Sequence, residues 1–120
     1  MKVLVAEDDP TIRQLLGVLL ARRNVPCSLV ENGQSAVEAW ENGEFKLILM
    51  DVQMPNLDGL EATRIIREKE GSRGGHVNII AMTAHAMAKD REECLRAGMD
   101  GYISKPIDFN ELLSLINQYG

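Results

Sequence analysis

Short apolar runs alternate with longer stretches of mixed polarity along the whole chain. The runs occupy residues 3–6, 27–30, 47–50, 77–82 and 101–104. Apolar runs of this length between turn signals are typical of strands buried on both faces of a parallel sheet. The stretches between them carry apolar residues at helical spacing. Five β-then-α units therefore predict an α/β fold, with one parallel sheet and helices on both of its faces.

The helices are delimited by capping residues and by apolar positions. Asp9 before Pro10 suits a helix start, and four leucines then share one helical face: Leu15, Leu16, Leu19 and Leu20. A later helix is expected to turn Ile66 inward and Arg67 outward, and to end before a loop over residues 71–75. Asp58 is its expected cap. The last two helices are expected over residues 84–97 and 107–119, the second capped by Asp108 or Asn110.

Length and composition restrict the class of protein further. The chain has 120 residues, which indicates one domain over residues 1–120 in the flavodoxin-like (βα)5 arrangement, with strand order 2-1-3-4-5. A net charge of −5 opposes nucleic-acid binding. The chain has neither a membrane-length apolar run nor a signal-peptide layout, so we expect a cytoplasmic protein without membrane contact. Cys27 and Cys94 lack metal or redox spacing and are expected to be buried thiols.

Polar side chains stand where four of the apolar runs end. Glu7 and Asp8 follow the first run, Asp51 follows the third, Thr83 the fourth and Lys105 the fifth. Because the carboxyl ends of parallel strands open on one sheet edge, where ligands bind, we expect these side chains to lie together. The expected strand order places Asp51 between the two other acids on one side and the hydroxyl and ammonium groups on the other.

This combination of groups indicates phosphoryl chemistry. Clustered carboxylates repel one another, and Mg²⁺ relieves the repulsion because it prefers oxygen ligands. An aspartate such as Asp51 can accept a phosphoryl group as an acyl phosphate. Phosphoryl transfer depends mainly on positioning and on charge neutralisation, which the metal and Lys105 would supply, while Thr83 could donate its hydroxyl to a phosphoryl oxygen.

The same residues carry a family resemblance. The chain resembles the receiver domain of bacterial two-component response regulators over essentially its whole length. The motifs are Glu7-Asp8, the run from Met50 to Pro55 with Asp58-Gly59, Thr83-Ala84, and Lys105-Pro106. The stretches from Thr83 to Met87 and from Gly98 to Pro106 are most similar to receivers attached to hybrid sensor histidine kinases.

The resemblance implies a role for each residue of the site. Asp51 is expected to be phosphorylated by a histidine kinase or a histidine phosphotransfer protein, which makes the chain a phosphorelay phosphoacceptor that catalyses its own phosphorylation and dephosphorylation. The expected Mg²⁺ ligands are Asp8, Asp51 and the backbone carbonyl of Gln53, with Glu7 reaching the ion through water. Thr83 and Lys105 are expected to contact the phosphoryl group. The Lys105–Pro106 bond is expected to be cis.

Two further residues are expected to connect the site with partners. Ile12 lies near the acids on the first helix, and we expect a partner's four-helix bundle to dock there. On phosphorylation, Thr83 is expected to move toward Asp51, and Tyr102 is expected to turn inward behind it, which would change a partner-binding surface.

Other classes of protein share parts of this pattern. A phosphohydrolase of the haloacid dehalogenase type also phosphorylates an aspartate beside Mg²⁺. Its nucleophile follows the first strand in an Asp-x-Asp pattern, whereas this chain has Glu7-Asp8-Asp9 there and little room for a cap domain. A dinucleotide-binding module would need G-x-G-x-x-G after a strand, which is missing. A receiver-like module used only for protein interaction would lack the acids or Lys105.

Overall fold

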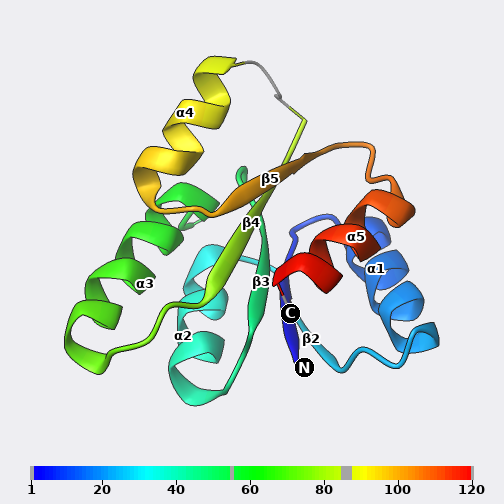
Figure 1. The fold of residues 1–120 in the computed structure, drawn as a ribbon, viewed down its shortest axis with the longest axis horizontal. Coiled ribbons are helices and arrows are strands. Elements are labelled where there is room, and N and C mark those ends of the chain that lie inside the picture. Colours follow the sequence, from blue (N-terminus) through cyan, green and yellow to red (C-terminus); the bar gives the residue numbers. More distant parts are fainter. Residues whose placement is uncertain (1, 55, 85–87, 120) are drawn as a thin grey trace.

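The computed structural model describes residues 2–54, 56–84 and 88–119 of the chain. It has five strands and five helices in strict alternation (Figure 1). The strands are β1 (Val3–Ala6), β2 (Cys27–Val30), β3 (Leu47–Asp51), β4 (Asn78–Thr83) and β5 (Gly101–Ser104). The helices are α1 (Pro10–Arg22), α2 (Gly33–Asn42), α3 (Gly59–Arg73), α4 (Ala88–Ala97) and α5 (Phe109–Tyr119).

All five strands are parallel and lie in one sheet of order β2-β1-β3-β4-β5, which confirms the predicted flavodoxin-like topology. β1, β3 and nearly all of β4 are buried on both faces, as continuous apolar runs require. The central strand β3 lies between β1 and β4, so its C-terminal residue, Asp51, stands at the middle of the sheet edge.

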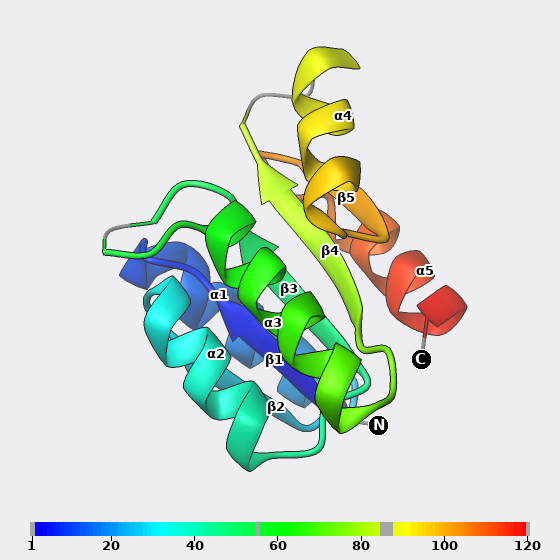
Figure 2. The same cartoon turned by 90° about the vertical axis from the view of Figure 1, so that its left-hand side faces the viewer.

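The helices form a layer on each face of the sheet. Leu4, Ile48 and Ile79 point into a core that α2, α3 and α4 cover, whereas Val3, Leu47 and Ile80 point into a core that α1 and α5 cover. Figure 2 shows α2 and α3 side by side in front of the sheet. None of the helices in the described part of the chain has the length and hydropathy that crossing a membrane needs.

Several helix predictions need correction. Leu15 is 55% exposed and does not share the buried face of Leu16 and Leu20. α3 continues through Gly71 to Arg73, where a loop was expected, and the Arg67 side chain is mostly buried in ion pairs with Glu70 and Asp100.

Among the described residues, the predicted first residues of the last two helices, Ala84 and Ile107, are not helical. α4 is described from Ala88, and residues 85–87 of the predicted helix lie outside the described residues. α5 begins at Phe109, because the Asp108 carboxylate caps it by accepting hydrogen bonds from the amides of Asn110 and Glu111.

Candidate phosphoacceptor site

Three carboxylates meet at the C-terminal edge of the sheet. The structure brings together one oxygen each from Glu7, Asp8 and Asp51, all within 4.8 Å of one another. Glu7 and Asp51 are almost completely buried, whereas Asp8 is exposed. The β1–β3 pairing is responsible, since it aligns Ala6 with Met50 and so brings the next residues, Glu7 and Asp51, to the same level of the sheet.

The start of α1 fixes the turn that carries two of these acids. The Asp9 carboxylate caps the helix by accepting hydrogen bonds from the amides of Thr11 and Ile12, as predicted. The Asp9 amide donates to Glu7 Oε2 at 3.1 Å. Arg13 donates from Nη1 to the Glu7 carbonyl at 2.8 Å. Arg13 is a site residue that the sequence analysis did not identify, and its position one turn after the Asp9 cap was the available signal.

Lys105 directly follows the edge strand β5, and its side chain reaches the acids. Its Nζ is 2.8 Å from Glu7 Oε1 and 3.4 Å from Asp51 Oδ1. The backbone holds the residue in place, because the Lys105 amide donates to the Thr83 carbonyl at 2.8 Å. The Lys105–Pro106 bond is cis, as the resemblance implied. One ammonium group thus faces three carboxylates.

The pKa values reflect this excess of negative charge. Burial, hydrogen bonds with Glu7 and Asp8, and the charge of Glu7 together raise the pKa of Asp51 to about 8, against the opposing charge of Lys105. The pKa of Asp8 is lowered, since hydrogen bonds with Asp51 and Glu7 outweigh the opposing effect of burial. Burial tends to lower the pKa of Lys105, but its contacts with Glu7 and Asp51 raise it overall. A further cation would stabilise the ionised form of Asp51.

The donor set fits a hard divalent cation. The atoms available are carboxylate oxygens, the ligand type that Mg²⁺ prefers. Glu7 Oε1 is buried and lies 2.8 Å from the Lys105 ammonium, and a carboxylate oxygen can accept a further hydrogen bond from a metal-bound water. The residues present therefore fit the predicted metal.

The remaining predicted residues divide into two groups. Thr83, Gln53 and Ile12 line a pocket of about 320 Å³ together with Asp51 and Lys105. The Gln53 backbone amide donates a hydrogen bond to Asp51 Oδ1 at 3.2 Å, which orders the loop after β3. Tyr102 is not among the residues that line this pocket; it lies on β5 with the Arg91 guanidinium 4.5 Å from its ring centroid.

The doubly wound sheet has a cluster of acids and a lysine at the carboxyl ends of its strands. This arrangement defines a flavodoxin-like domain of the class that binds phosphoryl groups where the strand order reverses. A family model described as the response regulator receiver domain matches residues 3–117. The chain belongs to the response regulator receiver domain family.

Curated relatives of the chain are histidine kinases. The chain is 45% identical over 121 residues to hybrid signal transduction histidine kinase I of Dictyostelium discoideum, a match that covers 97% of the chain and 7% of the kinase. The chain is 39% identical over 116 residues to the sensor histidine kinase GacS of Pseudomonas protegens, covering 96% of the chain and 13% of that protein. The chain thus spans a small fraction of the length of these relatives.

Solved structures of receiver domains agree with this chain in fold. The receiver domain of a sensor histidine kinase from Pseudomonas aeruginosa, solved with a magnesium ion coordinated in its active site cleft, has a TM-score of 0.88 and 39% identity, covering 98% of this chain and 95% of that chain. A chain in the co-crystal structure of the Saccharomyces cerevisiae histidine phosphotransfer protein Ypd1 with the receiver domain of its downstream response regulator Ssk1 has a TM-score of 0.97 and 34% identity. That match covers 100% of this chain and 88% of the other.

Proposed function

We propose that the chain is a phosphorelay phosphoacceptor in which Asp51 takes a phosphoryl group from a phosphohistidine. The observation that carries this proposal is the buried Asp51 carboxylate, which lies within 4.8 Å of carboxylate oxygens of Glu7 and Asp8 and 3.4 Å from the Lys105 ammonium. An Asp51 oxygen bonds to phosphorus as the phosphorus–nitrogen bond breaks, and the imidazole nitrogen keeps the bonding electron pair.

The chain's own residues supply charge and position. Lys105 lies where it can pair with an oxygen of the incoming phosphoryl group while it remains close to Glu7. Thr83 lines the same pocket, so its hydroxyl can hydrogen-bond to a phosphoryl oxygen. Preorganised charges of this kind provide most of the catalysis in phosphoryl transfer.

Asp8, Asp51 and the Gln53 backbone carbonyl are the proposed ligands of Mg²⁺, with Glu7 acting through a water molecule. The acidic cluster of this chain and the relative that was solved with a magnesium ion in its active site cleft support this assignment. When bound, the ion neutralises negative charge as the phosphoryl group approaches. Asp8 is exposed, so an ion and its waters can reach the cluster from solvent.

The proposed donor is the phosphohistidine of a histidine kinase or of a histidine phosphotransfer protein. The kinase relatives and the complex with Ypd1 support both kinds of partner. Ile12 lies on α1 at the rim of the 320 Å³ pocket, which makes it the proposed docking contact. A turnover enzyme acting on phosphate esters is less well supported, because its nucleophile would follow β1, where Glu7 is paired with Lys105.

Transfer from a phosphohistidine donor tests this function. Purified, phosphorylated donor should pass its label to the wild-type chain in Mg²⁺, and EDTA should stop the transfer. Asp51→Asn should accept none. Asp9→Asn is a matched control, because it removes an acid from the same turn while asparagine remains a good helix cap. Transfer to Asp51→Asn at the wild-type rate would refute the proposal.

A further inference from the structure

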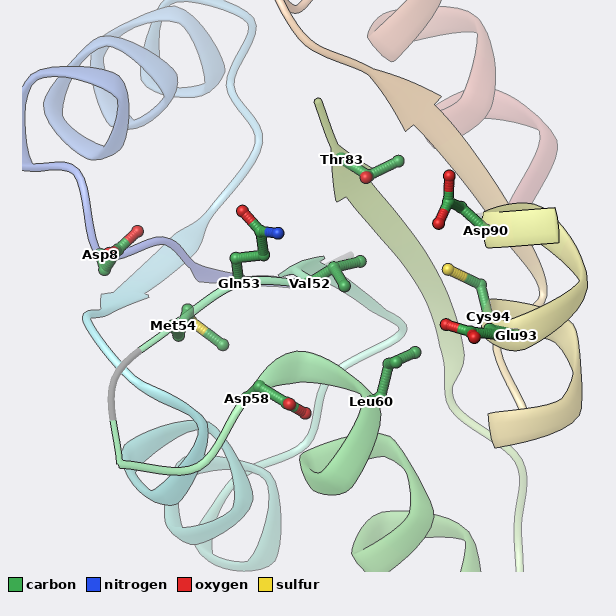
Figure 3. Close-up of a pocket in the computed structure, with 10 residues that line it drawn as sticks. All are labelled: Asp8, Val52, Gln53, Met54, Asp58, Leu60, Thr83, Asp90, Glu93 and Cys94. Atoms are coloured by element: carbon green, nitrogen blue, oxygen red, sulfur yellow. The ribbon is translucent and has the colours of Figure 1, made fainter. Parts of the chain in front are cut away.

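A second pocket adjoins the acid site on the side of α3 and α4 (Figure 3). Its volume is about 670 Å³, within the range of small-molecule binding sites. It shares Asp8, Val52, Gln53 and Thr83 with the smaller pocket around Asp51. The residues that belong to the larger pocket alone are Met54, Asp58, Leu60, Asp90, Glu93 and Cys94.

The inner wall of this pocket is apolar and ends at a thiol. Met54 and Cys94 are only 9% and 4% exposed, and Leu60 lies between them at the start of α3. Figure 3 shows the Cys94 sulfur directed from α4 into the pocket. The Cys94 carbonyl accepts a hydrogen bond from the Met99 amide at 3.0 Å, but the thiol has no hydrogen bond within the described part of the chain. Burial, together with the charges of Asp90 and Glu93, raises its pKa, so the group is a neutral thiol.

The rim of the pocket is acidic. Asp8, Asp58, Asp90 and Glu93 line it, and none of the ten lining residues carries a positive charge. These acids do not form a second metal cage, because Glu7, Asp8 and Asp51 are the only described residues that bring three suitable ligand atoms within 4.8 Å. Separated carboxylates around an apolar wall favour a cation that is larger than a metal ion.

We propose that this pocket binds a small organic cation, consisting of an ammonium or guanidinium group on an apolar body. The charged group lies at the rim beside Asp90 and Glu93, and the apolar body covers Leu60 and Cys94. The proposal does not rest on the phosphoacceptor function, although an occupant would lie next to Thr83 and Gln53, which also line the pocket around Asp51. Desolvation of the apolar body and attraction to the rim both contribute to binding.

Benzylamine and benzyl alcohol form a matched pair of probes, because they share an apolar ring and differ in charge. The rate of Cys94 alkylation by iodoacetamide reports occupancy, and Cys27 on β2 serves as an internal control, both followed by peptide mass spectrometry. Benzylamine at ten times its Kd should slow alkylation of Cys94 about tenfold and leave Cys27 unchanged. Amide shifts on titration should be largest at Leu60, Asp90 and Cys94.

Two variants separate specific binding from other effects. Asp90→Asn/Glu93→Gln should lose the protection, whereas Glu92→Gln should keep it, since Glu92 is exposed on α4 and does not line the pocket. Equal protection by benzyl alcohol would overturn the proposal. So would protection that persists in the double variant, shifts centred on Glu7 and Asp51, or no saturable effect of benzylamine up to about 10 mM.

Discussion

At the scale of single residues, the acidic cluster at the sheet edge destabilises the folded protein. The Asp51 side chain is 3% exposed and lies beside two other carboxylates. The Lys105 ammonium forms ion pairs with Asp51 and Glu7. Burying an ionised carboxylate is costly when its charge is incompletely paired. The surrounding sheet is well packed and holds the group there, which is typical of sites poised for chemistry.

Asp51→Asn should therefore stabilise the metal-free protein at alkaline pH. The pKa of Asp51 rises from 3.8 to about 8 on folding, so the folded state holds a proton that the unfolded state releases between these values. This contribution is fully present below the unfolded pKa and is lost as the pH rises through the folded pKa. Asparagine removes that loss. Between pH 5 and pH 8.5 the gain should grow by roughly 4 kcal/mol, since about three pH units separate pH 5 from the folded pKa and each is worth about 1.4 kcal/mol.

Urea unfolding in EDTA at pH 5 and pH 8.5 measures the effect. The difference between Asp51→Asn and wild type should grow with pH. A loss of stability in Asp51→Asn that is equal at both pH values would contradict the assigned electrostatics and indicate simple packing damage.

At the scale of elements, two glycines allow the backbone to pass close to the site. A Cβ atom at Gly59 would lie 2.2 Å from the Asp51 carbonyl oxygen, and one at Gly33 would lie 2.0 Å from that of Leu57. The Gly59 amide donates to the Val52 carbonyl at 3.0 Å, and the Gly33 amide donates to that of Leu57 at 3.0 Å. These contacts bring the starts of α2 and α3 against the loop after β3, and so fix where that loop leaves Asp51.

Gly59→Ala and Gly71→Ala should change stability in opposite directions. Alanine at 59 collides with the backbone beside Asp51 and should cost more than about 2 kcal/mol, as overpacking in a tight site does. Gly71 is exposed in α3, and a Cβ atom added there would meet no atom within 4 Å, so alanine should add about 0.5–1 kcal/mol. Thermal unfolding of both variants checks this, and destabilisation by Gly71→Ala would count against α3 extending to Arg73.

The strands and the site residues on them could be predicted because their signals are local. An apolar run followed by an acid fixes both a buried strand and its functional end, as at Leu47–Asp51. The end of α3 could not be predicted, because contacts with residues far away in the sequence stabilise its last turn. Glu70 accepts a hydrogen bond from the Val77 amide at 2.7 Å, and the Arg73 guanidinium lies 4.6 Å from the Trp40 ring centroid. The pairing of Lys105 with Glu7 likewise depends on the fold.

At the scale of the whole molecule, α1 presents an apolar surface beside the acid site. Leu15 and Val18 are 55% and 50% exposed, and half-buried Ile12 extends this surface toward Asp51. Exposed apolar groups that adjoin a functional site are typical of protein-binding surfaces. The unexpected exposure of Leu15 thus supports a docking role for this part of α1.

Ile12→Arg should slow phosphotransfer from a histidine donor about tenfold or more, because a charge at the centre of a docking surface costs at least about 1.4 kcal/mol. Phosphorylation by a small phosphodonor should be unchanged. Leu95→Arg, at a 60% exposed position on α4, is the matched control and should leave both rates alone. Equal slowing of Ile12→Arg with both donors would indicate a damaged fold instead.

Phosphorylation of Asp51 should also change the conformation of Tyr102 on β5. The Tyr102 ring is in contact with the Arg91 guanidinium, so inward rotation of the ring would break a link between α4 and β5. Beryllofluoride, a phosphoryl mimic, should shift the NMR signals of Thr83, Tyr102 and Arg91, and these shifts should shrink in Thr83→Ala. Changes limited to the loops that touch Asp51 would rule out the switch and leave a phosphate carrier.

The most direct test of the central claim locates the phosphoryl group itself. The chain is incubated with a small phosphodonor and Mg²⁺, the acyl phosphate is trapped by borohydride reduction, and the product is mapped by peptide mass spectrometry. We predict a single modified residue, Asp51, with no product in EDTA and greatly reduced product in Asp8→Asn. Modification at Asp8, Asp9 or any other residue, or undiminished labelling of Asp51→Asn, would contradict the account.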